Sequence, residues 1–189
     1  MSTQERLPSP EIEKAAAILK KGGIVIFPTD TVYGIGCRFD DLGAIGRLYQ
    51  IKGTPPSQPF PILVTNTDQV KKFAKITTFA KFLIDAYWPG GLTIIFAGRK
   101  IGQKQAFRMP DSEVVKSLID KVGVPIVGTS ANFHGQKTPS SFEELDPEIT
   151  KLANFVIRGK CQKGIESTVV DTTVKPPKIL RQGAVPLEL

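Results

Sequence analysis

The chain has 189 residues, of which 41% are hydrophobic and 23% charged, so it is long enough for one globular domain (1–189) with a proper core. Lysine and arginine exceed aspartate and glutamate by 25 − 18 = 7, which favours either an anionic partner (nucleotide, RNA or phosphate) or a solvated basic surface. We expect no secretion signal, because the N-terminus is polar, and no membrane partner, because no apolar run approaches about 20 residues. We also expect no disulfide, because the two cysteines are isolated. Together these features predict a cytoplasmic protein.

Apolar spacing and cap residues predict alternating helices and strands. Ser9 and Pro10 are typical of a helix start, and Leu42, Ile45 and Leu48 lie at helical spacing, so we expect them to face a core. The expected helices begin at Pro10 and at Asp40 or Asp41, and further ones cover 68–74, 78–87, 112–121 and 142–151. The expected strands cover 24–27, 62–65, 92–97, 125–129, 154–157, 167–171 and 178–181, with loops at 29–38, 52–61 and 133–140. This order predicts an α+β fold with helices flanking a sheet.

Several common chemistries are improbable for this sequence. His134 is the only histidine, which argues against histidine zinc sites and histidine-dependent triads. The sequence contains no GxxxxGK[ST] loop, and no third glycine follows Gly34 and Gly36 to complete a dinucleotide-binding fingerprint. We therefore look for a site built from small polar residues.

Five polar clusters stand beside the expected strands and helices. They are PTDTVYGIG (28–36), QIKGTPP (50–56), GTSAN (128–132), ESTVVD (166–171) and LRQG (180–183). Open sheets place ligands at strand ends, where backbone groups are free. The first three clusters each have a plainer explanation: a Thr-stabilised turn for the first, a lysine charge that complements its helix dipole for the second, and a capping turn for the third. Arg108, on an expected buried strand, needs a carboxylate or phosphate partner.

The order of these motifs is more specific than any one of them. PTDTVYGIG, IKG, WPGGLT, FRMP, GTSAN, ESTVVD and LRQGA resemble, in sequence, the landmarks of the YrdC-type threonylcarbamoyl-AMP synthase family from about Gly23 to Gly183. The resemblance implies a single α+β YrdC-like domain, with a twisted mixed β-sheet flanked by helices and a concave basic face. It also implies the short single-domain form of the family.

The resemblance further implies an enzyme, a nucleotidyltransferase that makes L-threonylcarbamoyladenylate from ATP, L-threonine and bicarbonate. The product would serve the threonylcarbamoyl-adenosine modification of tRNA, and Mg²⁺ would accompany the ATP phosphates. The implied partners are tRNA or double-stranded RNA and downstream tRNA threonylcarbamoyl-transferase proteins. The chemistry needs positioning and charge neutralisation rather than a covalent enzyme intermediate.

Carried over residue by residue, the resemblance assigns the threonine substrate to Thr31, Arg108, Ser130 and Ser167. It assigns the nucleotide to Lys52, Thr54, Gln58, Lys104, Asn132, Ser140 and Arg181. Lys52 is also the expected catalytic residue, and no protein metal ligand is expected.

The sequence departs from the family pattern at Thr54 and at Phe60, where the family has Pro-Leu and this chain has Pro59 followed by Phe60. The family pattern is Lys-x-Arg, whereas here Lys52 is followed by Thr54; Arg38, Arg47 or Lys104 would then have to supply the missing charge. The departure keeps open an alternative from another class, a catalytically weak YrdC-like paralogue that acts as an RNA- or ribosome-associated binding protein. A third hypothesis, a carbamoyl-adenylate domain of hydrogenase maturation, is weaker because such domains occur inside much longer chains.

Overall fold

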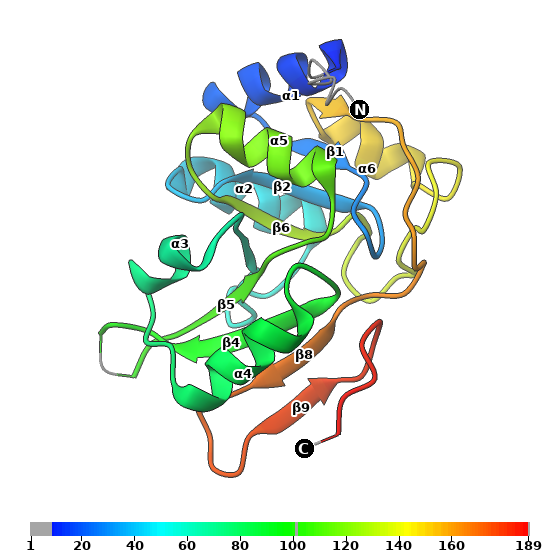
Figure 1. Ribbon diagram of the computed structural model, residues 1–189. Helices are drawn as coiled ribbons and strands as arrows, with labels where there is room; N and C mark the ends of the chain where they lie inside the picture. The colour runs from blue at the N-terminus through cyan, green and yellow to red at the C-terminus, as the bar shows by residue number, and fades with distance from the viewer. Residues whose placement is uncertain (1–8, 101, 189) are drawn as a thin grey trace, which may run out of the picture.

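The computed structural model describes residues 9–100 and 102–188. Its strands form one mixed sheet in the order β7-β1-β2-β6-β3-β5-β4-β8-β9 (Figure 1). The strands are β1 (Val25–Phe27), β2 (Gly34–Arg38), β3 (Ile62–Leu63), β4 (Leu92–Ala97), β5 (Lys104–Arg108), β6 (Ile126–Ser130), β7 (Phe155–Val156), β8 (Thr168–Asp171) and β9 (Lys178–Arg181). The helices are α1 (Pro10–Lys20), α2 (Leu42–Lys52), α3 (Thr67–Lys71), α4 (Thr78–Tyr87), α5 (Glu113–Val122) and α6 (Pro147–Leu152). This twisted mixed sheet with flanking helices confirms the expected α+β class.

Both faces of the sheet are covered at the β1-β2-β6 end. Helices α1 and α5 lie side by side over one face (Figure 1) and form a core cluster that includes Val25 and Phe27 of β1. Ile26, between these two residues, points to the opposite face and packs in the cluster below α2 and α6. The alternation follows from the two-residue period of a strand.

Only one face is covered at the β5-β4-β8 end. Helices α3 and α4 cover the face that carries Ile94, Phe107 and Val170. Because Ile62 of β3 pairs directly with Val127 of β6, these two side chains share a face, and the α3–α4 cover therefore lies on the same face as α2. None of the six described helices lies over the other face of β5, β4 and β8, and this is where the cleft described below opens.

The loop expected over 29–38 contains a strand that sequence analysis missed. Gly34 and Gly36 weaken the strand pattern, yet β2 pairs antiparallel with both β1 and β6. The glycines are required by close packing, because a Cβ at Gly34 would lie 2.8 Å from the Phe27 ring and one at Gly36 would lie 2.1 Å from the Val127 carbonyl oxygen.

Other boundaries also differ. The helix expected over 142–151 begins only at Pro147, because Asp146 caps it by accepting a hydrogen bond from the amide of Glu148. The helix expected over 68–74 is Thr67–Lys71. Leu42, expected to face the core, is 82% exposed, because α2 buries Ala44, Leu48 and Lys52 instead. No helix in the described part of the chain is both long and apolar enough to span a membrane.

Candidate functional site

A cleft of about 950 Å³ opens over the sheet face that no helix covers. Alternate side chains of three strands form its floor, since every second residue of a strand points the same way. These are Thr93 and Ile95 of β4, Lys104, Ala106 and Arg108 of β5, and Val169 and Asp171 of β8. Loops after β1, α2 and β6 form the walls.

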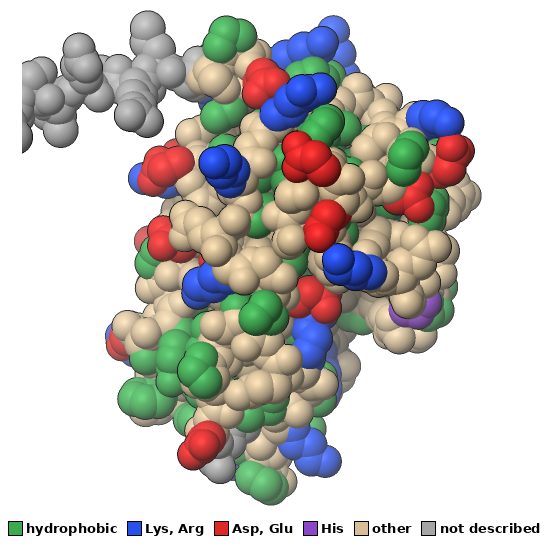
Figure 2. Space-filling view, turned by 90° about the vertical axis from the view of Figure 1, so that its right-hand side faces the viewer, with side chains coloured by type: hydrophobic (Ala, Val, Ile, Leu, Met, Phe, Trp, Pro, Cys, Tyr) green, Lys and Arg blue, Asp and Glu red, His purple; other side chains and the backbone are tan. Residues whose placement is uncertain are grey.

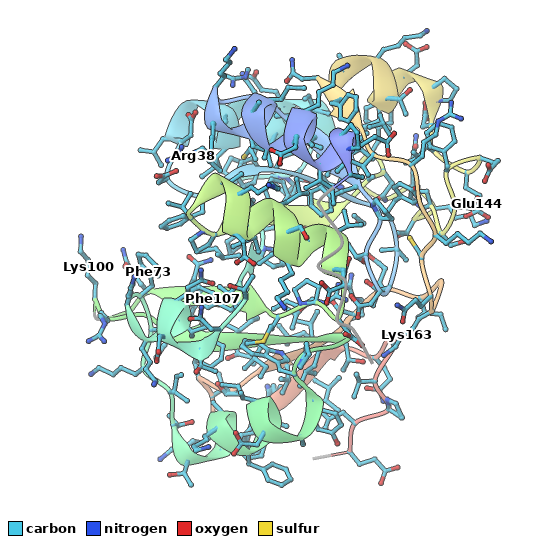
Figure 3. The ribbon with its side chains drawn as sticks, turned by 45° about the horizontal axis from the view of Figure 1, so that its top comes forward. Arg38, Phe73, Lys100, Phe107, Glu144 and Lys163 are labelled. Carbon is cyan, nitrogen blue, oxygen red and sulfur yellow. The ribbon has the colours of Figure 1, made fainter. Side chains whose placement is uncertain are left out.

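Ten of the eleven site residues expected from the sequence line this one cleft. They are Thr31, Lys52, Thr54, Gln58, Lys104, Arg108, Ser130, Asn132, Ser167 and Arg181. The exception is Ser140, whose amide and hydroxyl both donate to the Glu144 carboxylate, on a loop that Figure 3 shows at the margin of the molecule. The structure thus brings the residues together, whereas their individual roles stay predictions.

Arg108 is buried at one end of the cleft and is held on three sides. Its Nη2 donates to Asp30 Oδ1 (2.5 Å), its Nη1 to Thr31 Oγ1 (2.8 Å) and its Nε to the Gly90 carbonyl oxygen (3.0 Å). Burial lowers the pKa of the Arg108 guanidinium, and the Asp30 carboxylate opposes this shift. The carboxylate partner expected for Arg108 is therefore Asp30.

Asp30 was not among the expected site residues. Its side chain is fully buried, and its Oδ2 has no hydrogen-bond partner among the described residues. The turn that presents it is fixed by Thr29, whose Oγ1 accepts from the Thr31 amide (3.1 Å) and donates to the Val32 carbonyl oxygen (2.7 Å). The sequence offers no local signal for the pair, because Asp30 and Arg108 are 78 residues apart.

Ser167 connects the buried end of the cleft to its open end. Its hydroxyl lies 2.8 Å from Thr93 Oγ1 and accepts from Arg181 Nη2 (3.2 Å). Arg181 also donates to the Ser167 carbonyl oxygen (3.0 Å) and to Glu166 Oε1 (2.9 Å). Arg181 is thus held at the edge of the cleft with part of its fork in solvent.

Lys52 is buried, although it ends helix α2. Its Nζ donates to the carbonyl oxygens of Ser130 and Asn132, both at 2.6 Å, so the side chain bridges to the end of β6. Burial lowers the pKa of Lys52 to about 8, against the opposing effect of the Glu166 charge. Asn132 in turn donates to the Gln136 carbonyl oxygen (2.7 Å), which ties the loop after β6 to the same cluster. Lys52 Nζ also lies 3.5 Å from Asn132 Oδ1, a long contact that an anion in the cleft can replace.

The open end of the cleft contains Lys104, Thr54 and Gln58. Lys104 Nζ donates to Asp171 Oδ2 (2.8 Å), and hydrogen bonds from Lys104 and Thr173 outweigh the effect of burial and lower the pKa of Asp171. Thr54 Oγ1 is buried without a hydrogen-bond partner among the described residues. Of the three cations considered as substitutes for the missing arginine, only Lys104 lines the cleft.

The other two substitutes are engaged elsewhere. Arg38 pairs with Asp40, and Arg47 donates to the Gly22 carbonyl oxygen, in both cases away from the cleft. Four lysines or arginines and two carboxylates line the cleft, whereas on the face shown in Figure 2 positive and negative side chains are interspersed. Cationic side chains therefore outnumber carboxylates among the residues that line the cleft, and the expected basic concave face stays a prediction.

The model of the Sua5, yciO and yrdC family, described as "Telomere recombination", matches residues 17–183. The chain belongs to this family. The match covers the same stretch as the ordered motifs, from the end of α1 to the loop after β9.

Named relatives of this Sua5/YciO/YrdC-family chain include enzymes. A threonylcarbamoyl-AMP synthase of Pyrococcus abyssi is 33% identical over 100% of this chain and 58% of its own length. A putative threonylcarbamoyl-AMP synthase of Methanocaldococcus jannaschii is 33% identical over 96% of this chain and 92% of its own. The first relative is the longer protein, and the chain spans little more than half of it.

Solved structures of family members share the fold. The P. abyssi Sua5 structure complexed with L-threonine superposes with a TM-score of 0.86 at 32% identity, over 97% of this chain and 57% of that one. Escherichia coli YciO superposes with a TM-score of 0.83 at 26% identity, over 91% of this chain and 88% of that one. Both carry the sheet on which the cleft is built.

Proposed function

We propose that this Sua5/YciO/YrdC-family protein is a threonylcarbamoyl-AMP synthase that uses ATP, L-threonine and bicarbonate, and that its product serves threonylcarbamoyl-adenosine formation in tRNA. The observation that carries the proposal is the convergence of ten expected residues, which are spread along the chain from Thr31 to Arg181, on one cleft. The synthase names of relatives that match nearly the whole chain support it.

The buried end of the cleft suits an amino acid. Arg108 has five N–H donors, of which three are used by the protein, so two remain for a substrate carboxylate. The hydroxyls of Thr31 and Ser167 lie close by, at hydrogen-bonding distance from Arg108 and Thr93 respectively, and can distinguish a substrate hydroxyl. The L-threonine complex of the P. abyssi protein supports this assignment by analogy.

The proposed reaction has two steps and no covalent enzyme intermediate. The threonine amine adds to bicarbonate with loss of water and gives an N-carboxylate (a carbamate). One carbamate oxygen then attacks the α-phosphorus of ATP, the bond to the bridging oxygen breaks, and pyrophosphate leaves. Lys52, Lys104 and Arg181 are the cations available to stabilise the charge on the phosphates, which is the main catalytic need of such a transfer.

Magnesium would enter with ATP. Mg²⁺ on a nucleotide keeps several waters and takes one or two protein carboxylates, and Glu166 and Asp171 are the two carboxylates that line the cleft. No group of three acidic, histidine or cysteine residues that would form a complete metal cage occurs in the described ranges. The donor set therefore fits a metal held mainly by the substrate. Bound Mg²⁺ would neutralise part of the phosphate charge.

The remaining partners belong to the same proposal. A product destined for tRNA requires a downstream threonylcarbamoyl-transferase, and a net positive chain suits contact with tRNA or double-stranded RNA. We propose a cytoplasmic location, because ATP, L-threonine and tRNA are all available there. The comparisons do not favour the alternative of a catalytically weak RNA- or ribosome-associated paralogue.

Pyrophosphate release tests the proposal directly. We expect release from MgATP only when both L-threonine and bicarbonate are present, and much less with serine or valine, because each lacks one of the two groups that the pocket can sense. Arg108→Lys should lower activity by weakening threonine binding at least tenfold, while ATP binding measured by calorimetry stays unchanged. Binding of ATP and threonine without any pyrophosphate release would refute the synthase and support the binding paralogue.

A further inference from the structure

A second hollow of about 470 Å³ lies on the opposite face of the sheet from the cleft. Its floor is the cross-strand pair Ile62 and Val127. At this pair the described helices leave the sheet uncovered, between helix α2 on one side and helices α3 and α4 on the other. Phe39, Ile45 and Tyr49 form the wall on the α2 side, and Phe73, Gly98 and Gln103 form the opposite wall. We call this hollow the α2 groove.

The α2 side of the groove looks like half of a helix–helix interface. Leu42, Ile45 and Tyr49 recur at positions i, i+3 and i+7 and line the groove, and Leu42 is 82% exposed. Gly46, one turn after Leu42, has open space where its Cβ would be. A glycine inside an exposed helix costs about 0.5–1 kcal/mol relative to alanine, and no contact with the residues that the structure describes requires Gly46. Close approach of a second backbone would explain it.

The opposite rim of the groove is basic. Lys72 adjoins Phe73 in the chain, and Arg99 and Lys100 adjoin Gly98; Figure 3 shows Phe73 and Lys100 next to each other at one side of the molecule. Neither Lys72 nor Lys100 forms an ion pair among the described residues, whereas the Arg99 guanidinium donates to the backbone carbonyl oxygens of Lys71 and Lys72. An apolar groove beside unpaired cations complements an apolar surface flanked by carboxylates.

We propose that the α2 groove binds an acidic amphipathic helix of a protein partner. The helix would place apolar side chains at i, i+3, i+4 and i+7 on Leu42, Ile45 and Phe73, and its acidic residues beside Lys72 and Lys100. RNA fits poorly, because the floor is aliphatic and the aromatic rings pack on one another, edge to face in the pair Phe39–Phe73 and stacked in the pair Tyr49–Phe60.

An occupant of the α2 groove would touch the wall of the substrate cleft. Pro59, Phe60 and Lys104 line both hollows. Tyr49, in the groove, stacks on Phe60 at 4.2 Å between ring centroids and donates through its hydroxyl to the Gln58 carbonyl oxygen. A partner docked in the α2 groove therefore contacts residues that hold the loop 53–61. Its binding can change the affinity of the cleft for substrate, and substrate in the cleft can change the affinity of the groove for the partner.

Titration of the ¹⁵N-labelled protein with synthetic peptides tests the inference, and it does not depend on the proposed activity. The probes are a panel of 18-residue helices that share one apolar face, with polar faces rich either in glutamate or in lysine. We expect the acidic peptides to shift the amide signals of Ile45, Phe73 and the loop 57–60, and to bind at least tenfold more tightly than the basic ones.

Matched variants locate the site. Leu42→Ser should weaken acidic-peptide binding at least tenfold, whereas Leu152→Ser, at another exposed leucine on α6, should change it less than twofold. Lys100→Glu should weaken it several-fold, and Lys160→Glu should not. The proposal is overturned by equal binding of acidic and basic peptides or by insensitivity to Leu42→Ser. It is also overturned if a single-stranded oligouridine occupies the site in a Leu42-dependent way, or if sedimentation shows a dimer that Leu42→Ser dissociates.

Discussion

The two ends of the cleft carry the same kind of ion pair in different surroundings. Arg108 and Asp30 have side chains that are 8% and 0% exposed, whereas in the pair of Lys104 and Asp171 the lysine side chain is 47% exposed and only the aspartate is nearly buried, at 9%. A buried pair is fixed by the low polarity around it, because neither charge can be left alone without a large cost. An exposed lysine exchanges partners cheaply. The difference suggests a rigid end that sets specificity and an adaptable end that accepts variable phosphate geometry.

The largest effect should come from breaking the buried pair. Asp30→Asn leaves the Arg108 guanidinium buried without its counter-charge, which should lower the free energy of unfolding by about 3–5 kcal/mol. Urea denaturation measures this loss. Asp40→Asn is the matched control, because it breaks an aspartate–arginine pair at the surface and should cost less than about 1 kcal/mol. Equal losses in the two variants would show that burial does not distinguish the ends of the cleft.

A second prediction concerns the pH dependence of stability due to Lys52. Its pKa is about 8 in the folded protein and 10.5 in an ordinary lysine, so between these values the unfolded chain binds more protons. The Lys52 contribution to the free energy of unfolding should therefore rise with pH, by about 2 kcal/mol between pH 8 and 9.5. Cys37, whose pKa burial raises to about 12, acts in the opposite direction above pH 9.

The Lys52 contribution is isolated by subtraction. Denaturation curves of the wild type and Lys52→Met, measured at the same pH values, share the Cys37 contribution, so their difference reports Lys52 alone. A difference that is flat from pH 8 to 9.5 would mean that the Lys52 ammonium is as well solvated in the fold as in the unfolded chain. Bound nucleotide should also flatten the difference between wild type and Lys52→Met, because a nearby anion favours the charged form of Lys52.

Local patterns predicted most of the elements but not how the elements meet. Caps such as Ser9 and Asp41 accept the hydrogen bonds that their sequence positions predict. Strand β2 was missed because Gly34 and Gly36 are needed for close packing against Phe27 and Val127, and both of these residues lie outside the strand. Leu42 was expected to be buried because spacing shows that a helix has an apolar face, but not whether anything covers it.

The distinction between local patterns and contacts distant in the sequence also holds for the residues of the cleft. The motif order named ten residues that line the cleft, because each motif follows or precedes a strand of one sheet. Asp30, Glu166 and Asp171 were not assigned, although they hold Arg108, Arg181 and Lys104 in place. These ion pairs join residues 78, 15 and 67 positions apart, so only the sheet order reveals them.

The smallest effect on stability should come from the pair at the open end of the cleft. Lys104→Gln removes a lysine whose side chain is 47% exposed, and Asp171, whose side chain is only 9% exposed, keeps its hydrogen bonds from Thr173, so the free energy of unfolding should fall by only about 1 kcal/mol. The same change removes a cation that can leave Asp171 for a phosphate, so the calorimetric Kd for MgATP should rise about tenfold while that for threonine stays constant. Lys104→Arg, which keeps the charge, should retain most of the ATP affinity. If Lys104→Gln instead weakens threonine and ATP equally, the two ends of the cleft are coupled, and the division between a rigid and an adaptable end is wrong.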